Sequence, residues 1–162
     1  MSKKTIWITG GSTGIGKALA IKFASKGWNV AVSARREELL NELSNTYENI
    51  SAFPLDVTNK LKCEEVFNQI KNKFQSIDIC FFSTGTWNPK KEKDIDIEQI
   101  EDVFKINFFG TVNSIKAVEK YFRDKKDGII TIVSSIAGYR GLPNSTGYGP
   151  SKSALNLSLI HI

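Results

Sequence analysis

The sequence predicts an α/β fold in which helices cover both faces of a parallel sheet. Two observations carry this prediction. Short apolar segments alternate with longer segments of helical periodicity, an order that favours parallel strands joined by right-handed crossovers. A glycine-rich turn joins the first apolar segment to the first helix, as at the start of a doubly wound sheet. The predicted strands are 5–9, 29–34, 50–54, 77–82 and 129–133.

The first strand leads into the turn Thr9-Gly10-Gly11-Ser12-Thr13-Gly14-Ile15-Gly16 and a helix to about Lys26. Unpaired N–H groups and the positive end of the helix dipole converge on such a turn, which suits a phosphate. Glycine is needed where a Cβ would block the turn, the pyrophosphate or the packing of helix on strand. We therefore predict a dinucleotide site. Its predicted contacts here are Gly10, Ser12, Thr13, Gly14, Ile15 and Gly16.

Two alternatives remain for this turn. It can be a glycine-rich connection that binds no ligand. Residues Gly11 to Lys17 also satisfy the first part of the pattern of P-loop nucleotide hydrolases, in which the next residue carries a hydroxyl group that binds magnesium. Ala18 stands at that position and cannot bind a metal. We therefore favour the dinucleotide.

The second strand is apolar throughout and ends in Arg35 and Arg36, before a helix to about Tyr47. In a dinucleotide site the end of this strand meets the adenosine ribose, where an acid selects the free 2′-hydroxyl group and an arginine selects a 2′-phosphate. No acid stands at this strand end, so Arg35 and Arg36 predict NADP(H). The alternative is that both arginines are surface residues at a helix start, although arginine there opposes the helix dipole.

The third strand is followed by Leu55-Asp56-Val57-Thr58, and Thr58 or Asn59 is predicted to cap a helix to Phe74. We expect Asp56 at the adenine amino group, with Val57 in the same site. A turn or capping role is the alternative for Asp56.

The fourth strand is followed by the turn Ser83-Thr84-Gly85 and a polar loop, 87–96, that contains Lys90 to Lys93. A long helix is predicted from Ile97 to about Tyr121 because apolar residues recur at helical spacing. The fifth strand leads into a glycine-rich loop, 134–147, and a helix from Tyr148. Since parallel strands end at one edge of the sheet, Ser83 and Gly85 join the predicted cofactor site.

Tyr148 and Lys152 stand four residues apart and share one face of the last helix. An ammonium group beside a phenol stabilises the phenolate, which makes Tyr148 a candidate general acid or base. Tyr121 and Lys125 repeat the spacing. That second pair ends a long helix away from the carboxyl edge of the sheet, and we interpret it as surface packing.

Together, the glycine turn, Asn107, Ser134-Ser135 and Tyr148-Gly-Pro-Ser-Lys152 make the chain resemble the short-chain dehydrogenase/reductase family. The resemblance covers nearly the whole chain. It implies a Rossmann-type doubly wound sheet and a nicotinamide-dependent oxidoreductase that acts on a small carbonyl or alcohol substrate. Together with the arginines at the end of the second strand, it predicts hydride transfer between NADP(H) and that substrate. A dinucleotide-binding module without catalysis is the alternative.

The resemblance also implies roles for individual residues. Tyr148 would protonate the carbonyl oxygen, and Lys152 would favour ionisation of the phenol and hold the nicotinamide ribose. Ser135 would bind the substrate oxygen, with Ser134 structural. Asn107 would order a water that links the lysine to solvent, or else be a buried amide satisfied by the main chain.

Two positions depart from the family pattern. Phe82-Ser83-Thr84-Gly85 replaces the usual Asn-Asn-Ala-Gly, so the contact of the second asparagine falls to the shorter Ser83. Pro150 replaces a small residue two before the lysine. Proline is tolerated in a first helical turn, so we expect little effect from it.

Composition indicates an ordinary globular protein. The net charge of +5 comes mostly from scattered lysines, without the arginine stripe that nucleic-acid binding would favour. No apolar stretch is long enough to span a bilayer, and the expected location is the cytoplasm. Cys63 and Cys80 are expected to be reduced and structural.

Residues 1–156 are expected to form an incomplete NADP(H)-binding domain, with five strands present and the family's C-terminal strands missing. Leu157 to Ile162 matches the in-frame translation of a transposon-end sequencing adaptor, so 157–162, including His161, is expected to be a non-native tail. The fifth strand would then be a bare apolar edge. We expect this chain to be insoluble or inactive, and the intact protein to be an active homo-oligomer.

Overall fold

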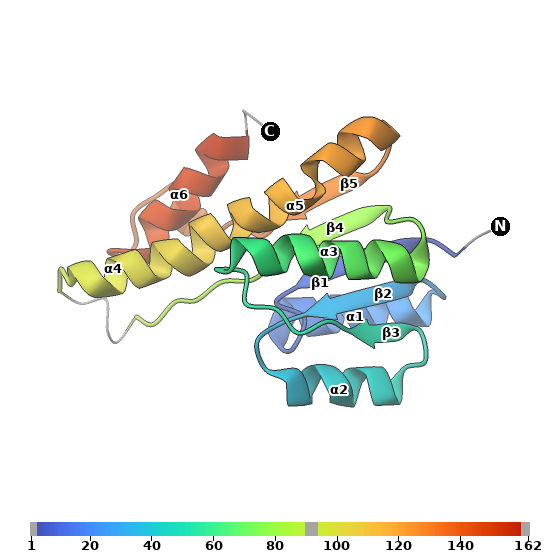
Figure 1. Cartoon of the computed structure of the whole chain (residues 1–162). Coiled ribbons are helices and arrows are strands. Elements are labelled where there is room, and N and C mark those ends of the chain that lie inside the picture. Colours follow the sequence, from blue (N-terminus) through green and yellow to red (C-terminus); the bar gives the residue numbers. More distant parts are fainter. Residues whose placement is uncertain (1–2, 90–93, 160–162) are drawn as a thin grey trace.

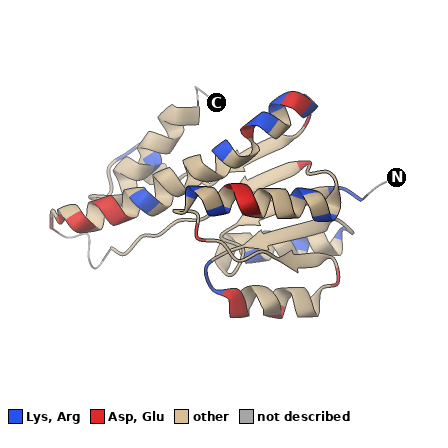
Figure 2. Ribbon diagram, viewed as in Figure 1, with Lys and Arg blue, Asp and Glu red and all other residues tan. Residues whose placement is uncertain are grey.

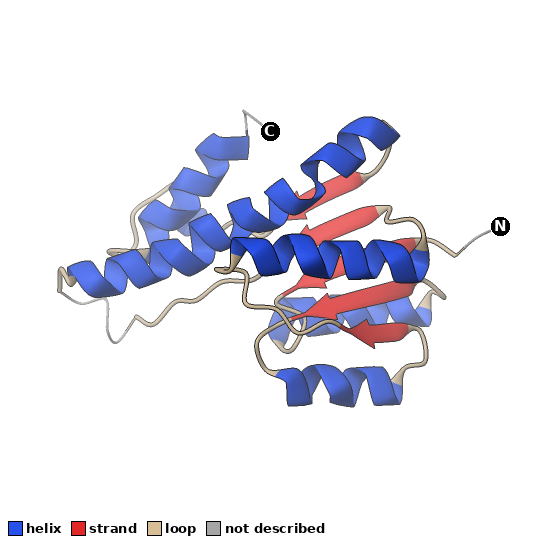
Figure 3. Ribbon diagram, in the orientation of Figure 1, coloured by secondary structure: helices blue, strands red, loops and turns tan. Residues whose placement is uncertain are grey.

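Helices cover both faces of a five-stranded parallel sheet in the computed structural model, which describes residues 3–89 and 94–159 (Figure 1 and Figure 3). The strands lie in the order β3-β2-β1-β4-β5. Their bounds are β1 Thr5–Thr9, β2 Asn29–Ser33, β3 Ile50–Ala52, β4 Ile79–Phe82 and β5 Ile129–Ile132. The predicted fold class is confirmed, and each predicted strand is found within two residues of its expected ends.

The helices are α1 Gly14–Ser25, α2 Glu37–Thr46, α3 Lys60–Phe74, α4 Ile97–Phe104, α5 Gly110–Lys125 and α6 Tyr148–Ser158. Of the two predicted caps of α3, Asn59 is the observed one, since its Oδ1 accepts a hydrogen bond from Lys62 N at 3.0 Å. The strand order reverses between β1 and β4, and ligands of doubly wound sheets bind at such a switch point. The strands point their carboxyl ends toward α4 and α6 (Figure 1).

The central strand β1 divides the core into two halves. Ile6 and Ile8 face α1 and α2, and Trp7 faces α3 and α5. All three side chains are fully buried. The indole Nε1 of Trp7 donates to Ser33 Oγ at 3.0 Å, so its one polar group is satisfied inside the core. The sheet is therefore anchored on both faces next to the glycine turn.

The long helix predicted from Ile97 to Tyr121 is not continuous. A π-helical turn, Lys105–Phe109, separates α4 from α5, and α5 runs on to Lys125. The spacing of apolar residues along the chain does not reveal this π-helical turn, because the turn depends on contacts with segments outside the helix. The Asn107 side chain bonds to Thr86, and Gly110 lies so close to Val57 that a Cβ on Gly110 would stand 2.5 Å from Val57 Cγ2.

Charged residues of both signs are spread along the helices and loops (Figure 2). No helix in the described part of the chain is long and apolar enough to cross a membrane. Among the same residues, no group of three or more His, Cys, Asp or Glu side chains could hold a metal ion. Both cysteines are buried thiols, and burial raises the pKa of Cys63 to about 11. The tail residues 160–162, with His161, and the loop residues 90–93 lie outside the described ranges.

Candidate active site

The glycine turn after β1 folds back on itself in a way that only glycine permits. Gly10 has a φ of +70°, and a Cβ on Gly16 would collide with the main-chain carbonyl of Gly10. Gly11 N donates to Ser33 O at 3.1 Å, which ties the turn to β2. Thr13 occupies the N-cap position of α1 but makes no side-chain capping bond there. The turn thus directs main-chain N–H groups of the helix start toward one side.

A cleft of about 690 Å³ opens over this turn, at the switch point between β1 and β4. Its volume falls in the range of roughly 300–1,000 Å³ found for cofactor sites. Every residue that the sequence assigns to the cofactor, apart from Tyr148 and Lys152, lines this cleft. They are Gly10, Ser12, Thr13, Gly14, Ile15, Gly16, Arg35, Arg36, Asp56, Val57, Ser83 and Gly85.

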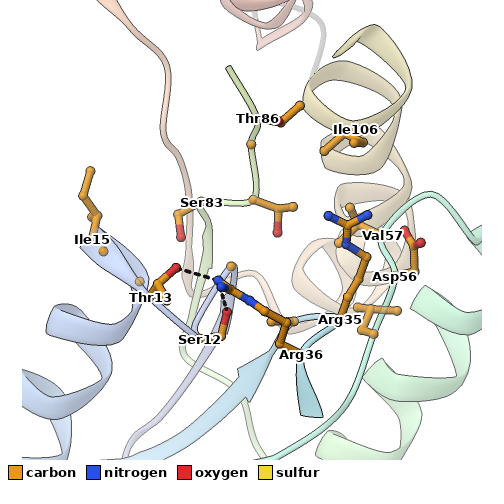
Figure 4. Close-up of a pocket in the computed structure, with 17 residues that line it drawn as sticks. Ser12, Thr13, Ile15, Arg35, Arg36, Asp56, Val57, Ser83, Thr86 and Ile106 are labelled. Carbon is orange, nitrogen blue, oxygen red and sulfur yellow. Dashed lines mark hydrogen bonds between the residues drawn. The ribbon is translucent and has the colours of Figure 1, made fainter. Parts of the chain in front are cut away.

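The two adjacent arginines point in different directions (Figure 4). Arg36 Nη2 donates to Thr13 Oγ1 at 2.9 Å and to Ser12 Oγ at 3.2 Å, so this guanidinium binds the glycine turn. The Arg35 guanidinium stands on the other side, near Val57 and Asp56. Both arginines are exposed at the start of α2 and both line the cleft, so their cofactor role stays a prediction.

Asp56 forms a local turn with Thr58. Its Oδ1 accepts from Thr58 N at 2.9 Å and from Thr58 Oγ1 at 2.8 Å, which is the turn role stated as the alternative. Burial works against ionisation, but these hydrogen bonds and the charges of Arg35 and Lys105 hold the pKa of Asp56 below its ordinary value. The carboxylate therefore faces the cleft in its ionised form.

Ser83 does not project freely into the cleft. Its hydroxyl donates to Thr9 O at 2.7 Å and so joins the end of β4 to the end of β1. A Cβ on Gly16 would stand 3.0 Å from this Oγ. The shorter side chain found in place of asparagine therefore braces the glycine turn from beneath.

Tyr148 and Lys152 lie at the start of α6, beside the same edge of the sheet. Lys152 Nζ stands 5.7 Å from the centroid of the Tyr148 ring and donates to Val133 O at 2.8 Å. Lys152 is only 4% exposed, and burial lowers the pKa of its ammonium from the ordinary lysine value. A Cβ on Gly85 would lie 3.5 Å from Nζ, so the lysine adjoins the inner end of the cleft.

Asn107 is fully buried in the π-helical turn. Its Oδ1 accepts from Thr86 N at 2.7 Å, and its Nδ2 donates to Thr86 O at 3.0 Å and to Ser151 Oγ at 3.1 Å. These bonds match the alternative of a buried amide satisfied mainly by the main chain. The carboxamide thereby connects the segment after β4 with α6, so the water-ordering role stays a prediction.

Ser135 and Ser134 follow β5 and differ in their surroundings. Ser135 Oγ accepts from Ala137 N at 3.2 Å, at the start of the 3₁₀ turn Ile136–Gly138. The hydroxyl oxygens of Ser134 and Thr84 are buried and have no hydrogen-bond partner among the described residues. Both residues are half-buried, but Ser135 Oγ acts as an acceptor in the bond to Ala137 N, whereas Ser134 Oγ is enclosed.

Sequence reasoning missed Trp87, which lies in the loop after Gly85. Its indole stacks on the Tyr148 ring, with centroids 5.1 Å apart and planes inclined by 19°. Its Nε1 donates to Asn144 O at 3.1 Å. The available signal was a large aromatic residue two positions after the glycine of the β4 turn.

The second pair, Tyr121 and Lys125, lies at the opposite, amino edge of the sheet, as expected. Its interpretation as surface packing is too weak. Tyr121 Oη accepts from Ile77 N at 3.0 Å, and Lys125 Nζ bonds to Asp78 Oδ1 at 3.0 Å. Asp78 Oδ2 in turn accepts from Thr5 N at 2.8 Å. The pair ties the end of α5 to the start of β1 and β4.

The P-loop alternative is not favoured by this geometry. Lys17 lies within α1 and is not among the residues that line the cleft, and Ala18 is exposed. A glycine turn before a helix, at the switch point of a parallel sheet, instead defines the Rossmann-type class of dinucleotide-binding folds.

Comparison with known proteins identifies the family within this class. The family model described as short chain dehydrogenase matches residues 4–159. The chain belongs to the short-chain dehydrogenase family of oxidoreductases. Among curated relatives, Dehydrogenase/reductase SDR family member 7 of Mus musculus is 33% identical over 167 residues, covering 96% of this chain and 48% of the relative. An uncharacterized oxidoreductase of Staphylococcus epidermidis is 27% identical, covering 96% of this chain and 68% of the relative.

Solved structures agree with this assignment. ElxO with NADP bound superposes with a TM-score of 0.86 at 31% identity, covering 94% of this chain and 64% of that one. A short-chain dehydrogenase from Streptomyces avermitilis gives a TM-score of 0.89 at 25% identity, covering 99% of this chain and 59% of that one. The chain spans about half the length of the mouse relative and under two thirds of both solved chains.

Proposed function

We propose that this protein is an NADP(H)-dependent oxidoreductase that interconverts a carbonyl and an alcohol. The observation that carries the proposal is the continuity of the site. One cleft runs from the glycine turn to Gly85, and Gly85 lies against Lys152. A cofactor bound along the cleft would therefore end beside the Tyr148 and Lys152 side chains.

The residues present fit a dinucleotide. Open space lies beside Gly14, where a Cβ would meet no atom within 4 Å, and Thr13 does not cap α1 with its own side chain. Main-chain N–H groups at a helix start bind pyrophosphate oxygens well. Ser12, Thr13 and Gly14 are the residues that would hold the pyrophosphate, and the bound cofactor would supply the hydride.

Two arginines at the end of β2 favour a 2′-phosphate. Arg35 is the residue that would contact it, because Arg36 is already bonded to Ser12 and Thr13. Arg36 would then fix the turn and add positive charge. The NADP bound in ElxO supports this preference by analogy.

The proton is handled by the side chains at the inner end of the cleft. Tyr148 would donate a proton to the carbonyl oxygen, and Ser135 would donate a hydrogen bond to the same oxygen. Lys152 gives one hydrogen to Val133 O, so its ammonium has others for a ribose hydroxyl. Lys152 Nζ also lies 5.7 Å from the centroid of the Tyr148 ring, so its ammonium stands next to the proposed proton donor.

The preference is tested by measuring NADPH and NADH affinity for wild type, Arg35→Ala and the control Arg123→Ala, which lies on the outer side of α5. A charge-assisted hydrogen bond is worth about 1.5–3 kcal/mol, so Arg35→Ala is expected to weaken NADPH binding roughly 10- to 100-fold. NADH binding should change little. Equal affinity of the wild type for both cofactors would overturn the NADP(H) assignment.

A further inference from the structure

The Trp87 indole covers one face of the Tyr148 ring, although the two residues belong to distant segments. Trp87 lies between β4 and α4, and Tyr148 is the first residue of α6. Their ring centroids are 5.1 Å apart, and the planes are inclined by only 19°. Offset stacking of this kind stabilises an aromatic pair beyond the area that it buries.

The indole is fixed from two sides. Its Nε1 donates to Asn144 O at 3.1 Å, in the loop that precedes α6. The preceding residue, Thr86, has both main-chain polar groups bonded to the Asn107 side chain, at 2.7 and 3.0 Å. Trp87 is therefore a braced surface against which the Tyr148 ring rests.

The Tyr148 ring needs such a support because of where it stands. It begins a helix directly after a loop, and Lys152 Nζ lies 5.7 Å from its centroid. Trp87 itself remains 44% exposed, so the stack lies at the mouth of the site. A general acid that is displaced by about 1 Å can lose on the order of 100-fold in rate.

We propose that Trp87 is a positioning residue whose indole holds the Tyr148 phenol in its orientation beside Lys152. The expected effect on turnover rests on the proposed function of Tyr148. The stacking of the two rings is independent of that function. Trp87 acts through Tyr148, since it stacks on that ring and is not among the residues that line the cofactor cleft.

The kinetic test compares Trp87→Ala and Trp87→Phe with Trp28→Phe in the full-length protein. Trp28 packs on Phe23, among the side chains of the α1 and α2 face, and serves as the matched control. Trp87→Ala is expected to lower kcat about tenfold or more while KM for NADPH is unchanged. Trp87→Phe should recover most of kcat because a phenyl ring can still stack, and Trp28→Phe should resemble wild type. An unchanged kcat, or a rise in the KM of the carbonyl substrate alone, overturns the proposal.

A second measurement is independent of turnover. The fluorescence of Trp87 is obtained by subtracting the emission of Trp87→Phe from that of wild type. Its quenching by acrylamide is then measured with Tyr148 in place and in the variants Tyr148→Phe and Tyr148→Ala. Tyr148→Ala should raise the quenching constant, and Tyr148→Phe should leave it unchanged. Equal quenching in all three backgrounds overturns the stack. A wild type that shows this protection but no NADPH-dependent turnover disproves the proposed function and leaves the inference about Trp87 standing.

Discussion

The molecule holds two tyrosine–lysine pairs of the same spacing, one at each edge of the sheet. The geometry within each pair is nearly equal, since Lys152 Nζ lies 5.7 Å from the Tyr148 centroid and Lys125 Nζ lies 5.8 Å from the Tyr121 centroid. The surroundings differ. Lys125 Nζ bonds to the Asp78 carboxylate, whereas Lys152 Nζ donates to the main-chain carbonyl of Val133 and forms no ion pair with the described carboxylates. The partners, and not the spacing, separate a structural pair from a candidate catalytic pair.

The pKa values of the two lysines are consequently shifted in opposite directions. Burial lowers the pKa of Lys152. Burial also acts on Lys125, but the hydrogen bond and charge of Asp78 outweigh it and raise the pKa of Lys125. An ammonium that is held by a carboxylate supports the fold, whereas one that is buried without a carboxylate is available to a ligand.

The largest difference between the two pairs is expected when the hydroxyl group of each tyrosine is removed. Tyr148→Phe should lower kcat roughly 10²- to 10⁴-fold, because general acid–base catalysis contributes about that much. Tyr121→Phe should leave kcat unchanged and lower the free energy of unfolding by about 1 kcal/mol, because Ile77 N loses its partner. NADPH oxidation and urea unfolding measure the two effects. Equal losses of turnover in both variants would remove the distinction between the pairs, and full activity of Tyr148→Phe would favour the module without catalysis.

Removing the lysines sharpens the contrast. Lys152→Met should weaken NADPH binding and turnover together, because the ribose contact and the charge beside Tyr148 are lost. Lys125→Met should keep NADPH affinity and lower the free energy of unfolding by about 1–3 kcal/mol, because Asp78 keeps its charge without its partner. Lys126→Met, at an exposed neighbouring position, is the control. A weaker NADPH complex in Lys125→Met would contradict the separation.

The pH dependence of stability should have opposite signs at the two lysines. For Lys152, the pKa in the folded state is below the unfolded value of about 10.4. Burying the charge therefore lowers the free energy of unfolding at neutral pH, and this penalty disappears as pH rises from the folded pKa to about 10.4. For Lys125, the folded pKa is higher, so its stabilisation is full below about 10.4 and is lost as pH rises through the folded pKa. Urea unfolding of wild type and each Met variant across alkaline pH measures both slopes. Parallel slopes would show that the two sites are electrostatically alike.

The smallest effect is expected at Lys120, which pairs with Asp124 at 2.6 Å on the outer side of α5. Both side chains are largely exposed, so Lys120→Ala should change the free energy of unfolding by less than about 0.5 kcal/mol and leave turnover unchanged. The variant calibrates the loss of any lysine from this helix. A change as large as that of Lys125→Met would mean that Asp78 has no special role.

Local patterns were sufficient for the fold and for the position of the cleft. Patterns within short segments of sequence predict the apolar strands, the glycine turn and the residues at the strand ends. The parallel arrangement of the strands then brings these ends together at one edge of the sheet. What could not be predicted depends on contacts between distant segments. Arg35 and Arg36 are adjacent in the sequence, yet one binds Ser12 and Thr13 and the other stands near Asp56.

The same reason explains the elements that sequence reasoning missed. The π-helical turn is held by bonds of Asn107 to Thr86 and Ser151, from two other segments. Trp87 stands in a polar loop without periodicity, and its stack on Tyr148 exists only after α6 is packed. The roles assigned to Ser135, Tyr148 and Lys152 in the reaction stay predictions.

The π-helical turn also sets the rotational phase between α4 and α5. Each residue of a helix advances about 100° around the axis, so deleting one residue within Lys105–Phe109 would rotate every side chain beyond it by that angle. Asn107 could then keep its hydrogen bonds only if Tyr121 and Lys125 lost theirs to Ile77 and Asp78. One extra residue in a single turn thus allows the same helix to brace both ends of the sheet at once.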